Sequence, residues 1–198
     1  MNYSKYAMKY KDCKQGSTKH KQIVNGYNKI KPLPRGYKVK YNDSWCATFV
    51  SFVLYNCGAK KAPYECSAPR MYNIAKKNKQ IVKSPKVNDI IFYDWDNDNS
   101  IDHVGIIYKM DSKYIYTIEG NKHEKCDIRK ISKHSDFIYG FARIPNGKTV
   151  VKKDNYEDVA KDVIKGKYGN GSDRKKNLEK KGYNYSKIQA LVNKLKKK

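Results

Sequence analysis

The chain has 198 residues, of which 39% are hydrophobic, and its formal net charge is +24. This length allows one domain of ordinary size and a small second one. No apolar run reaches the length of a membrane span, which excludes membrane insertion, and the N-terminus lacks the apolar core of a signal peptide.

The first third of the chain is predicted to be helical. Thr18 is of a helix-capping type, and a short later helix should end near Asn78. Apolar residues recur at spacings of three and four, which is the pattern of one helix face. The residues that carry this pattern are Tyr3, Tyr6, Ala7 and Tyr10, then Ile23, Val24, Tyr27 and Ile30, then Met71, Ile74 and Ala75.

Between these helices lies a cysteine in the first turn of a predicted buried helix. Asp43 and Ser44 are good N-cap residues, and Trp45 and Phe49 begin the apolar face. Cys46 would then lie where free backbone N–H groups and the helix dipole favour a thiolate, the nucleophilic form. The alternative is an inert core cysteine, because free cysteines are often buried.

From residue 89 the pattern changes to short β-branched and aromatic runs separated by polar turns. Strands are predicted at residues 89–95, 103–108, 114–118, 127–131 and 137–144. Helices followed by closely linked strands predict an α+β fold with an antiparallel sheet.

The last part of the chain is predicted to be a separate helical unit. We expect a first domain over residues 1–146, a linker over 147–153 and a small all-α domain over 154–198. Glycines divide the last segment into three short helices, at about 155–165, 171–181 and 185–196. By spacing, the core residues are Leu178, Ile188, Leu191, Val192 and Leu195.

A thiolate nucleophile needs a base, and the base needs a group that orients it. His103 opens a predicted strand beside a turn, where its side chain can face a helix terminus. Glu119 and Asn121 come just after a neighbouring strand, and either could accept the Nδ1–H of the imidazole. The other would orient the substrate or the oxyanion. Alternatively, His103 is structural and the two polar residues flank an ordinary glycine turn.

Four segments in this order, WCATFVSFV, NDIIFYDW, DHVGII and YTIEGN, resemble the CHAP family of cysteine, histidine-dependent amidohydrolases and peptidases. The resemblance covers about residues 1–146 and implies a papain-like domain that cuts peptidoglycan peptides. It assigns Cys46 as the nucleophile, His103 as the base, and Glu119 and Asn121 as polar partners. Thr48 stands where many relatives have Asp.

The C-terminal segment resembles the three-helix wall-binding repeat of a pneumococcal phage lysozyme, through GNG-x-x-R and GY-x-Y-x-x-x-Q-x-x-VN. The resemblance implies binding to the glycan–peptide unit of peptidoglycan. Tyr168 takes the place of a usual Trp as an aromatic platform, and Arg174 is a candidate carboxylate clamp. The binding residues implied are Tyr168, Asn170, Gly171, Arg174 and Gln189.

An acidic turn needs a separate test for metal binding. Four aspartates fall at about positions 1, 3, 5 and 9 of a calcium loop, but positions 6 and 12 are not the required Gly and Glu. The calcium-binding motif that some CHAP relatives carry upstream of the cysteine is also absent. The sequence therefore predicts a solvated hairpin tip, with no metal and no cofactor. The residues compared are Asp94, Asp96, Asp98, Asp102, Asn99 and Gly105.

Together these features predict a phage endolysin, a peptidoglycan hydrolase that acts as an N-acetylmuramoyl-L-alanine amidase or an endopeptidase. Its partner would be peptidoglycan, with teichoic acid as a second partner of the basic surface. It would be made in the host cytoplasm and reach the wall after holin-type release. The alternatives are a non-catalytic binder of nucleic acid or another polyanion, and an intracellular thiol amidase. Given the resemblances, no nucleic acid partner is expected.

Overall fold

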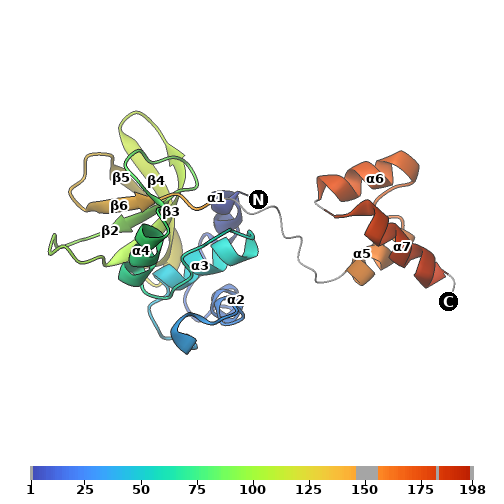
Figure 1. The fold of residues 1–198 in the computed structure, drawn as a ribbon, viewed down its shortest axis with the longest axis horizontal. Helices are drawn as coiled ribbons and strands as arrows, with labels where there is room; N and C mark the ends of the chain where they lie inside the picture. Colours follow the sequence, from blue (N-terminus) through green and yellow to red (C-terminus); the bar gives the residue numbers. More distant parts are fainter. Residues whose placement is uncertain (1, 146–155, 182, 197–198) are drawn as a thin grey trace. The chain divides into compact units, whose positions relative to one another are not determined.

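A computed structural model describes residues 2–145, 156–181 and 183–196. The chain divides into two compact units, residues 1–148 and 149–198, and each is described by itself (Figure 1). The expected linker at 147–153 lies outside the described residues. Within the described parts, no helix is long and apolar enough to cross a membrane.

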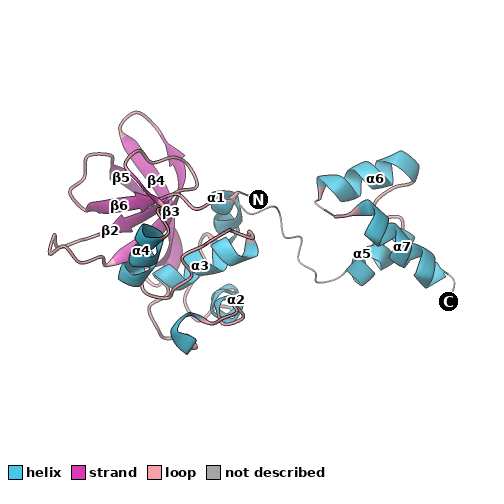
Figure 2. Ribbon diagram, in the orientation of Figure 1, coloured by secondary structure: helices cyan, strands magenta, loops and turns pink. Residues whose placement is uncertain are grey.

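The first unit begins with helices and ends with strands, which confirms the predicted α+β class. Figure 2 distinguishes the two kinds of element by colour. The N-cap of the second helix is Ser17, whose side chain accepts the His20 N–H, and Thr18 is its first residue. The helical elements are α1 (Tyr3–Ala7), the 3-10 turn η1 (Met8–Tyr10), α2 (Thr18–Tyr27), the 3-10 turn η2 (Pro34–Gly36), α3 (Cys46–Asn56) and α4 (Ala68–Lys77).

The sheet is antiparallel, with the order β1-β6-β2-β3-β4-β5. Its short edge strand β1 was not predicted, and β4 runs past the expected end at Ile118 to Lys122. Glu119 and Asn121 therefore lie within a strand and not after it. The strands are β1 (Ile81–Val82), β2 (Ile90–Tyr93), β3 (His103–Met110), β4 (Tyr114–Lys122), β5 (Lys125–Ser132) and β6 (Ile138–Ala142).

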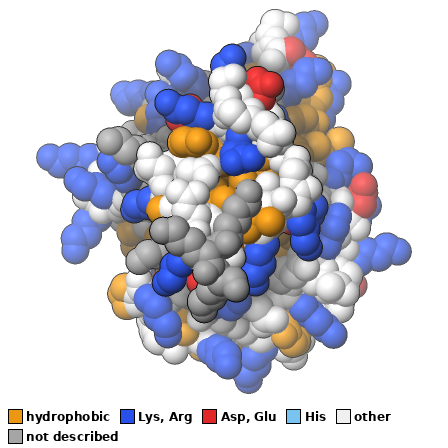
Figure 3. All heavy atoms as spheres, turned by 90° about the vertical axis from the view of Figure 1, so that its right-hand side faces the viewer, with side chains coloured by type: hydrophobic (Ala, Val, Ile, Leu, Met, Phe, Trp, Pro, Cys, Tyr) orange, Lys and Arg blue, Asp and Glu red, His pale blue; other side chains and the backbone are white. Residues whose placement is uncertain are grey.

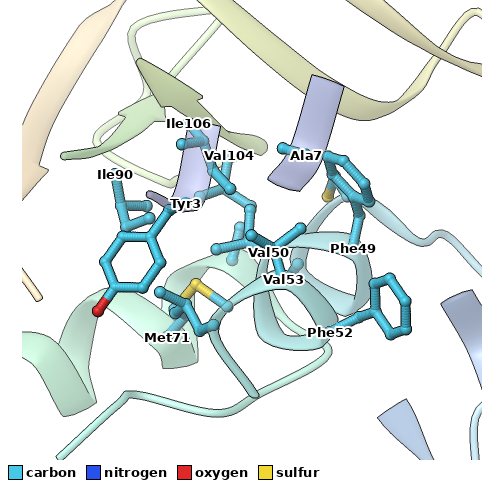
Figure 4. Close-up of a cluster of buried hydrophobic side chains, with 14 of the residues drawn as sticks. Tyr3, Ala7, Phe49, Val50, Phe52, Val53, Met71, Ile90, Val104 and Ile106 are labelled. Atoms are coloured by element: carbon cyan, nitrogen blue, oxygen red, sulfur yellow. The ribbon is translucent and has the colours of Figure 1, made fainter. Parts of the chain in front are cut away.

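The main core lies between the helices and one face of this sheet. Helix α3 is buried from Cys46 to Leu54, because it packs against β3, β4 and neighbouring helices. Figure 4 shows the side chains meeting from α1, α3, α4, β2 and β3. Those labelled are Tyr3, Ala7, Phe49, Val50, Phe52, Val53, Met71, Ile90, Val104 and Ile106.

The opposite face of the sheet carries a second, smaller apolar cluster. Ile91, Tyr93, Ile107 and Ile115 are fully buried there, because residues alternate between the two faces of a strand. By the register of the strands, Gly105 and the side chains of His103, Thr117, Glu119 and Arg129 belong to this same face. The polar part of the site is thus built on a buried apolar surface.

The second unit contains α5 (Tyr156–Ile164), α6 (Gly171–Lys180) and α7 (Tyr185–Lys196), as the glycine spacing predicts. Leu178, Ile188 and Val192 are buried, and Leu191 and Leu195 pack against them. The core assigned from spacing is therefore found in the structure.

The surface is strongly basic. The chain has 43 Lys and Arg residues against 19 Asp and Glu residues. In the face shown in Figure 3, basic side chains are spread widely and acidic ones are few. This excess attracts polyanions from a distance but carries no information about a specific partner.

Candidate active site

Cys46 is the first residue of α3 and is only 8% exposed. The predicted side-chain cap is wrong, because the N-cap is Trp45 and no side chain caps this end of the helix. Asp43 is used elsewhere, where its carboxylate accepts from Tyr37 Oη and the Lys40 N–H. Cys46 thus lies beside backbone N–H groups of the first turn that no side chain satisfies.

The imidazole of His103 interacts with the thiol of Cys46 and with the carboxylate of Glu119. Its Nε2 lies 3.2 Å from Glu119 Oε2, so the nitrogen held by the carboxylate is Nε2 and not the expected Nδ1. Burial lowers the pKa of His103, but hydrogen bonds and charges of Cys46 and Glu119 outweigh it and raise the pKa to about 9.

Glu119 is completely buried and its carboxylate is fully engaged. Oε1 accepts from Thr117 Oγ1 at 2.6 Å and from Tyr93 Oη at 2.8 Å, and Arg129 Nε lies 3.0 Å from both oxygens. Burial raises the pKa of Glu119, but the hydrogen bonds and charges of His103 and Arg129 outweigh it and lower the pKa to about 2. Glu119 is therefore held as a carboxylate that orients and stabilises the imidazolium.

Two glycines make room for this arrangement. A Cβ on Gly105 of β3 would lie 2.8 Å from Glu119 Cγ, so the carboxylate fits only beside a glycine. A Cβ on Gly120 would lie 2.5 Å from Phe49 Cβ, so a glycine lets β4 approach α3 closely. The segments DHVGII and YTIEGN thus each carry a glycine that the site geometry requires.

The remaining polar candidates form no hydrogen bond with the imidazole in the part of the chain that the structure describes. Asn121 is half-buried at a bulge of β4, with φ 57°, and the contacts of His103 are with Glu119 instead. His20 is completely buried in α2, and its ring centroid lies 4.7 Å from that of Trp45. His103 is thus the histidine that the fold brings to Cys46.

Sequence reasoning missed the residues that hold Glu119. Arg129 lies on β5, opposite Thr117, and its guanidinium carbon is 4.4 Å from the centroid of the Trp95 ring. Trp95 in turn stacks on Tyr93 at 4.5 Å. The stacking holds the guanidinium so that its Nε faces both oxygens of the carboxylate. The alternation of side chains along β5 could have suggested Arg129 only if the register of β5 against β4 had been known.

In the C-terminal unit, the structure brings three of the five expected binding residues together around one turn. Arg174 Nε donates to Gly169 O at 3.1 Å, and its terminal nitrogens donate to Asn170 Oδ1 at 3.0 Å and Gln189 Oε1 at 3.4 Å. Gly171 begins α6 beside this turn.

Tyr168 does not form the expected exposed platform. It is 7% exposed, and its ring belongs to the core of the unit, where it meets the ring of Tyr183 edge-on at 6.5 Å. Its role is therefore packing, and the polar groups around Arg174 are the accessible part of the candidate site.

A thiol and an imidazole in contact, with the imidazole held by a buried carboxylate, define a candidate cysteine hydrolase site. Comparison with protein families places this site in a CHAP domain, which matches residues 36–121, and finds a CW_7 repeat at residues 157–195. The chain therefore contains a CHAP domain followed by a CW_7 cell-wall-binding repeat, which is the composition of a peptidoglycan hydrolase. No curated protein matches the chain significantly. Cys46, His103 and Glu119 fall inside the CHAP match, and Arg129 falls outside it.

Proposed function

We propose that the chain is an endolysin-type enzyme that hydrolyses an amide bond of the peptidoglycan peptide with Cys46 as its nucleophile. The observation that supports the proposal is that the His103 imidazole interacts with both the Cys46 thiol and the Glu119 carboxylate. The bond cut is either that between muramic acid and L-alanine or one within the stem peptide or cross-bridge.

The proposed reaction is acyl transfer in two steps. The thiolate of Cys46 attacks the amide carbonyl, and the imidazolium of His103 protonates the leaving amine. Water, from which His103 takes a proton, then attacks the thioester and releases the free acid and the Cys46 thiol. Because Glu119 holds Nε2, Nδ1 is the nitrogen left to exchange protons with the thiol and the water.

Asn121 is assigned to the substrate side of this reaction. It follows Glu119 by two residues on β4 and is half-buried, so its amide is accessible while Glu119 is not. An amide N–H can stabilise the developing oxyanion or hold a substrate carbonyl.

Analysis of the fragments released from purified Gram-positive walls tests the reaction class. Either reaction adds water across an amide, so we expect new free amines in proportion to lysis, with no new reducing sugar ends. Mass spectrometry of the soluble fragments then identifies the bond. Release of reducing ends without new amines would mean that a glycosidic bond is cut, and the proposed chemistry would be wrong.

We propose that the repeat binds the peptide portion of peptidoglycan through Arg174. A guanidinium has five N–H donors, and three are used by Gly169, Asn170 and Gln189. Those three bonds hold the guanidinium in place, and its two remaining N–H groups can donate to a carboxylate of the wall peptide. Teichoic phosphates would add a non-specific attraction through the basic surface. Holin-type release stays a prediction of the sequence.

Salt distinguishes the specific contact from the general charge. At about 0.5 M salt the Debye length falls to about 4 Å, which screens the lysine-rich surface. We expect the wild-type chain to co-sediment with purified peptidoglycan at this salt. Arg174→Ala should lower the retained fraction by about tenfold, which is the worth of a bidentate charged contact.

Lys176→Ala is the matched control, because Lys176 is exposed on the same helix and its substitution removes the same charge. It should bind at high salt as the wild type does. Arg174→Lys, which keeps the charge and loses the fork, should resemble Arg174→Ala. If the wild type also detaches at about 0.5 M salt, the repeat is a general basic adhesive and the proposed clamp is wrong.

A further inference from the structure

The turn between β2 and β3 gathers carboxylates from both of its ends. Asp94 directly follows β2, and Asp102 directly precedes β3. Asp94, Asp96 and Asp102 each offer an oxygen within 4.8 Å of the others. Asp98, which the calcium-loop pattern also includes, is exposed and instead accepts the Ser100 N–H. The fold thus selects three of the four aspartates, and the selection depends on the folded turn and not on the loop pattern.

Asp94 is the buried member of the group, and it is incompletely satisfied. The residue is 5% exposed, and its Oδ2 accepts the N–H of Asn99 at 2.9 Å. Its Oδ1 is buried without a hydrogen-bond partner. A buried carboxylate oxygen without a hydrogen-bond donor is unfavourable, and a bound cation would compensate its charge in place of a donor.

The three carboxylates also form no ion pair in the described part of the chain. The chain as a whole has a net charge of +24, yet in the part that the structure describes none of these aspartates pairs with Lys or Arg. The segment 94–102 itself contains no basic residue. Three like charges this close together repel one another, and a divalent cation between them removes that repulsion.

We propose that Asp94, Asp96 and Asp102 bind a calcium ion. Oxygens that all lie within 4.8 Å of one another can share one cation. Ca²⁺ takes carboxylate oxygens and water in a flexible geometry, which a turn of this kind can supply, whereas Mg²⁺ demands near-ideal octahedral geometry and gives up its own water reluctantly. This site lies downstream of Cys46, on the turn that leads into His103.

The ion would join the two ends of the turn. Asp102 Oδ2 already accepts the N–H of Trp95 at 2.7 Å, so the ends are close before any ion binds. Bound calcium would fix the backbone that leads into His103 and hold Trp95 in its place beside Arg129. Calcium would thus stabilise the frame of the site without touching the substrate.

Terbium luminescence tests the site directly, without recourse to lysis. Trp95 lies between Asp94 and Asp96 in the sequence and can sensitise a Tb³⁺ ion bound in place of Ca²⁺. The full-length protein, freed of metal with a chelator, should show saturable luminescence on tryptophan excitation. Added Ca²⁺ should displace the Tb³⁺, and Mg²⁺ at the same concentration should not.

Asp96→Asn removes one ligand charge at an exposed position and should weaken Ca²⁺ binding by about tenfold or more. Asp98→Asn makes the same charge change in the same turn and should alter binding by less than about twofold. Calcium should also raise the melting temperature of the wild type but not of Asp96→Asn.

Three outcomes would overturn the proposal. The first is the absence of saturable binding at millimolar Ca²⁺. The second is an equal loss of Ca²⁺ affinity in Asp96→Asn and Asp98→Asn, which would mean that the ion is held only by diffuse charge attraction. The third is displacement of Tb³⁺ by Mg²⁺ as readily as by Ca²⁺, which would mean that the site does not select calcium.

Discussion

Replacing Cys46 with serine is expected to lower lysis of Gram-positive walls by more than about 10³-fold while wall binding is retained. A hydroxyl in the same place is far less ionised than a thiol and is not activated by the same imidazole. The CW_7 repeat lies in the other compact unit, so its binding should not depend on Cys46. A turbidity assay measures lysis, and co-sedimentation with the same walls measures binding.

Cys66→Ser is the matched control for this change. Cys66 is half-buried, and its sulfur accepts from Arg35 at 2.8 Å, a contact that a hydroxyl can replace. Lysis by this variant should remain within a few-fold of the wild type. If Cys46→Ser still lyses walls at a comparable rate, the nucleophile is another group.

Alkylation by iodoacetamide provides a second control on the same residue. Cys46 should be labelled first, because its neighbours are His103 and the start of a helix. Cys13 is the main competitor, since the Cys126 thiol lowers the pKa of Cys13 to about 6, but Cys13 is only 3% exposed. Peptide mapping distinguishes the two, and faster labelling of Cys13 would count against the assignment of Cys46.

Glu119→Gln is expected to lower activity by roughly 10²-fold or more and to destabilise the CHAP domain by about 2–3 kcal/mol. The amide keeps the shape but brings an N–H group towards donors from Thr117, Tyr93 and Arg129. It also removes the charge that stabilises the His103 imidazolium. Activity per folded molecule and thermal unfolding should be measured on the same preparation.

Glu65→Gln separates the catalytic effect from the structural one. Glu65 is also a buried carboxylate, 2% exposed, and it pairs with Arg35 and Arg70 in the same unit. This variant should lose stability but keep its activity per folded molecule. If both variants lose activity in proportion to stability alone, Glu119 is a structural residue and does not position His103.

The sequence sufficed to predict Cys46 and His103 as a pair, because each opens an element whose pattern is strong. The predicted N-cap of α3 was wrong, because capping depends on the backbone conformation at a single residue. Asp43 and Ser44 have suitable side chains, but the chain turns into the helix only at Trp45. The position of Cys46 in the first turn did not depend on that detail.

The choice between Glu119 and Asn121 could not be made from the sequence. It depends on the bulge that shifts the register between Glu119 and Lys122, and on how far β4 continues. The same is true of Arg129, which is ten positions from Glu119 along the chain and reaches it only through the pairing of β4 with β5. The pattern within one strand predicts which side chains share a face of the sheet. It does not predict which residue of the neighbouring strand lies opposite each of them.

The N-terminal segment pairs with the start of the edge strand β5. Asp12 N–H donates to Cys126 O and Cys126 N–H donates to Cys13 O, each at 2.8 Å, and Gln15 N–H donates to Glu124 O at 2.7 Å. A bare edge strand is a template for pairing with other chains, so we expect this cover to limit such pairing at the start of β5. A protein shortened to the family match at 36–121 would lose this cover, the β5 strand with Arg129, and the core side chains of α1 and α2. An exchange of this unit onto other binding repeats should therefore keep residues 1–145 together.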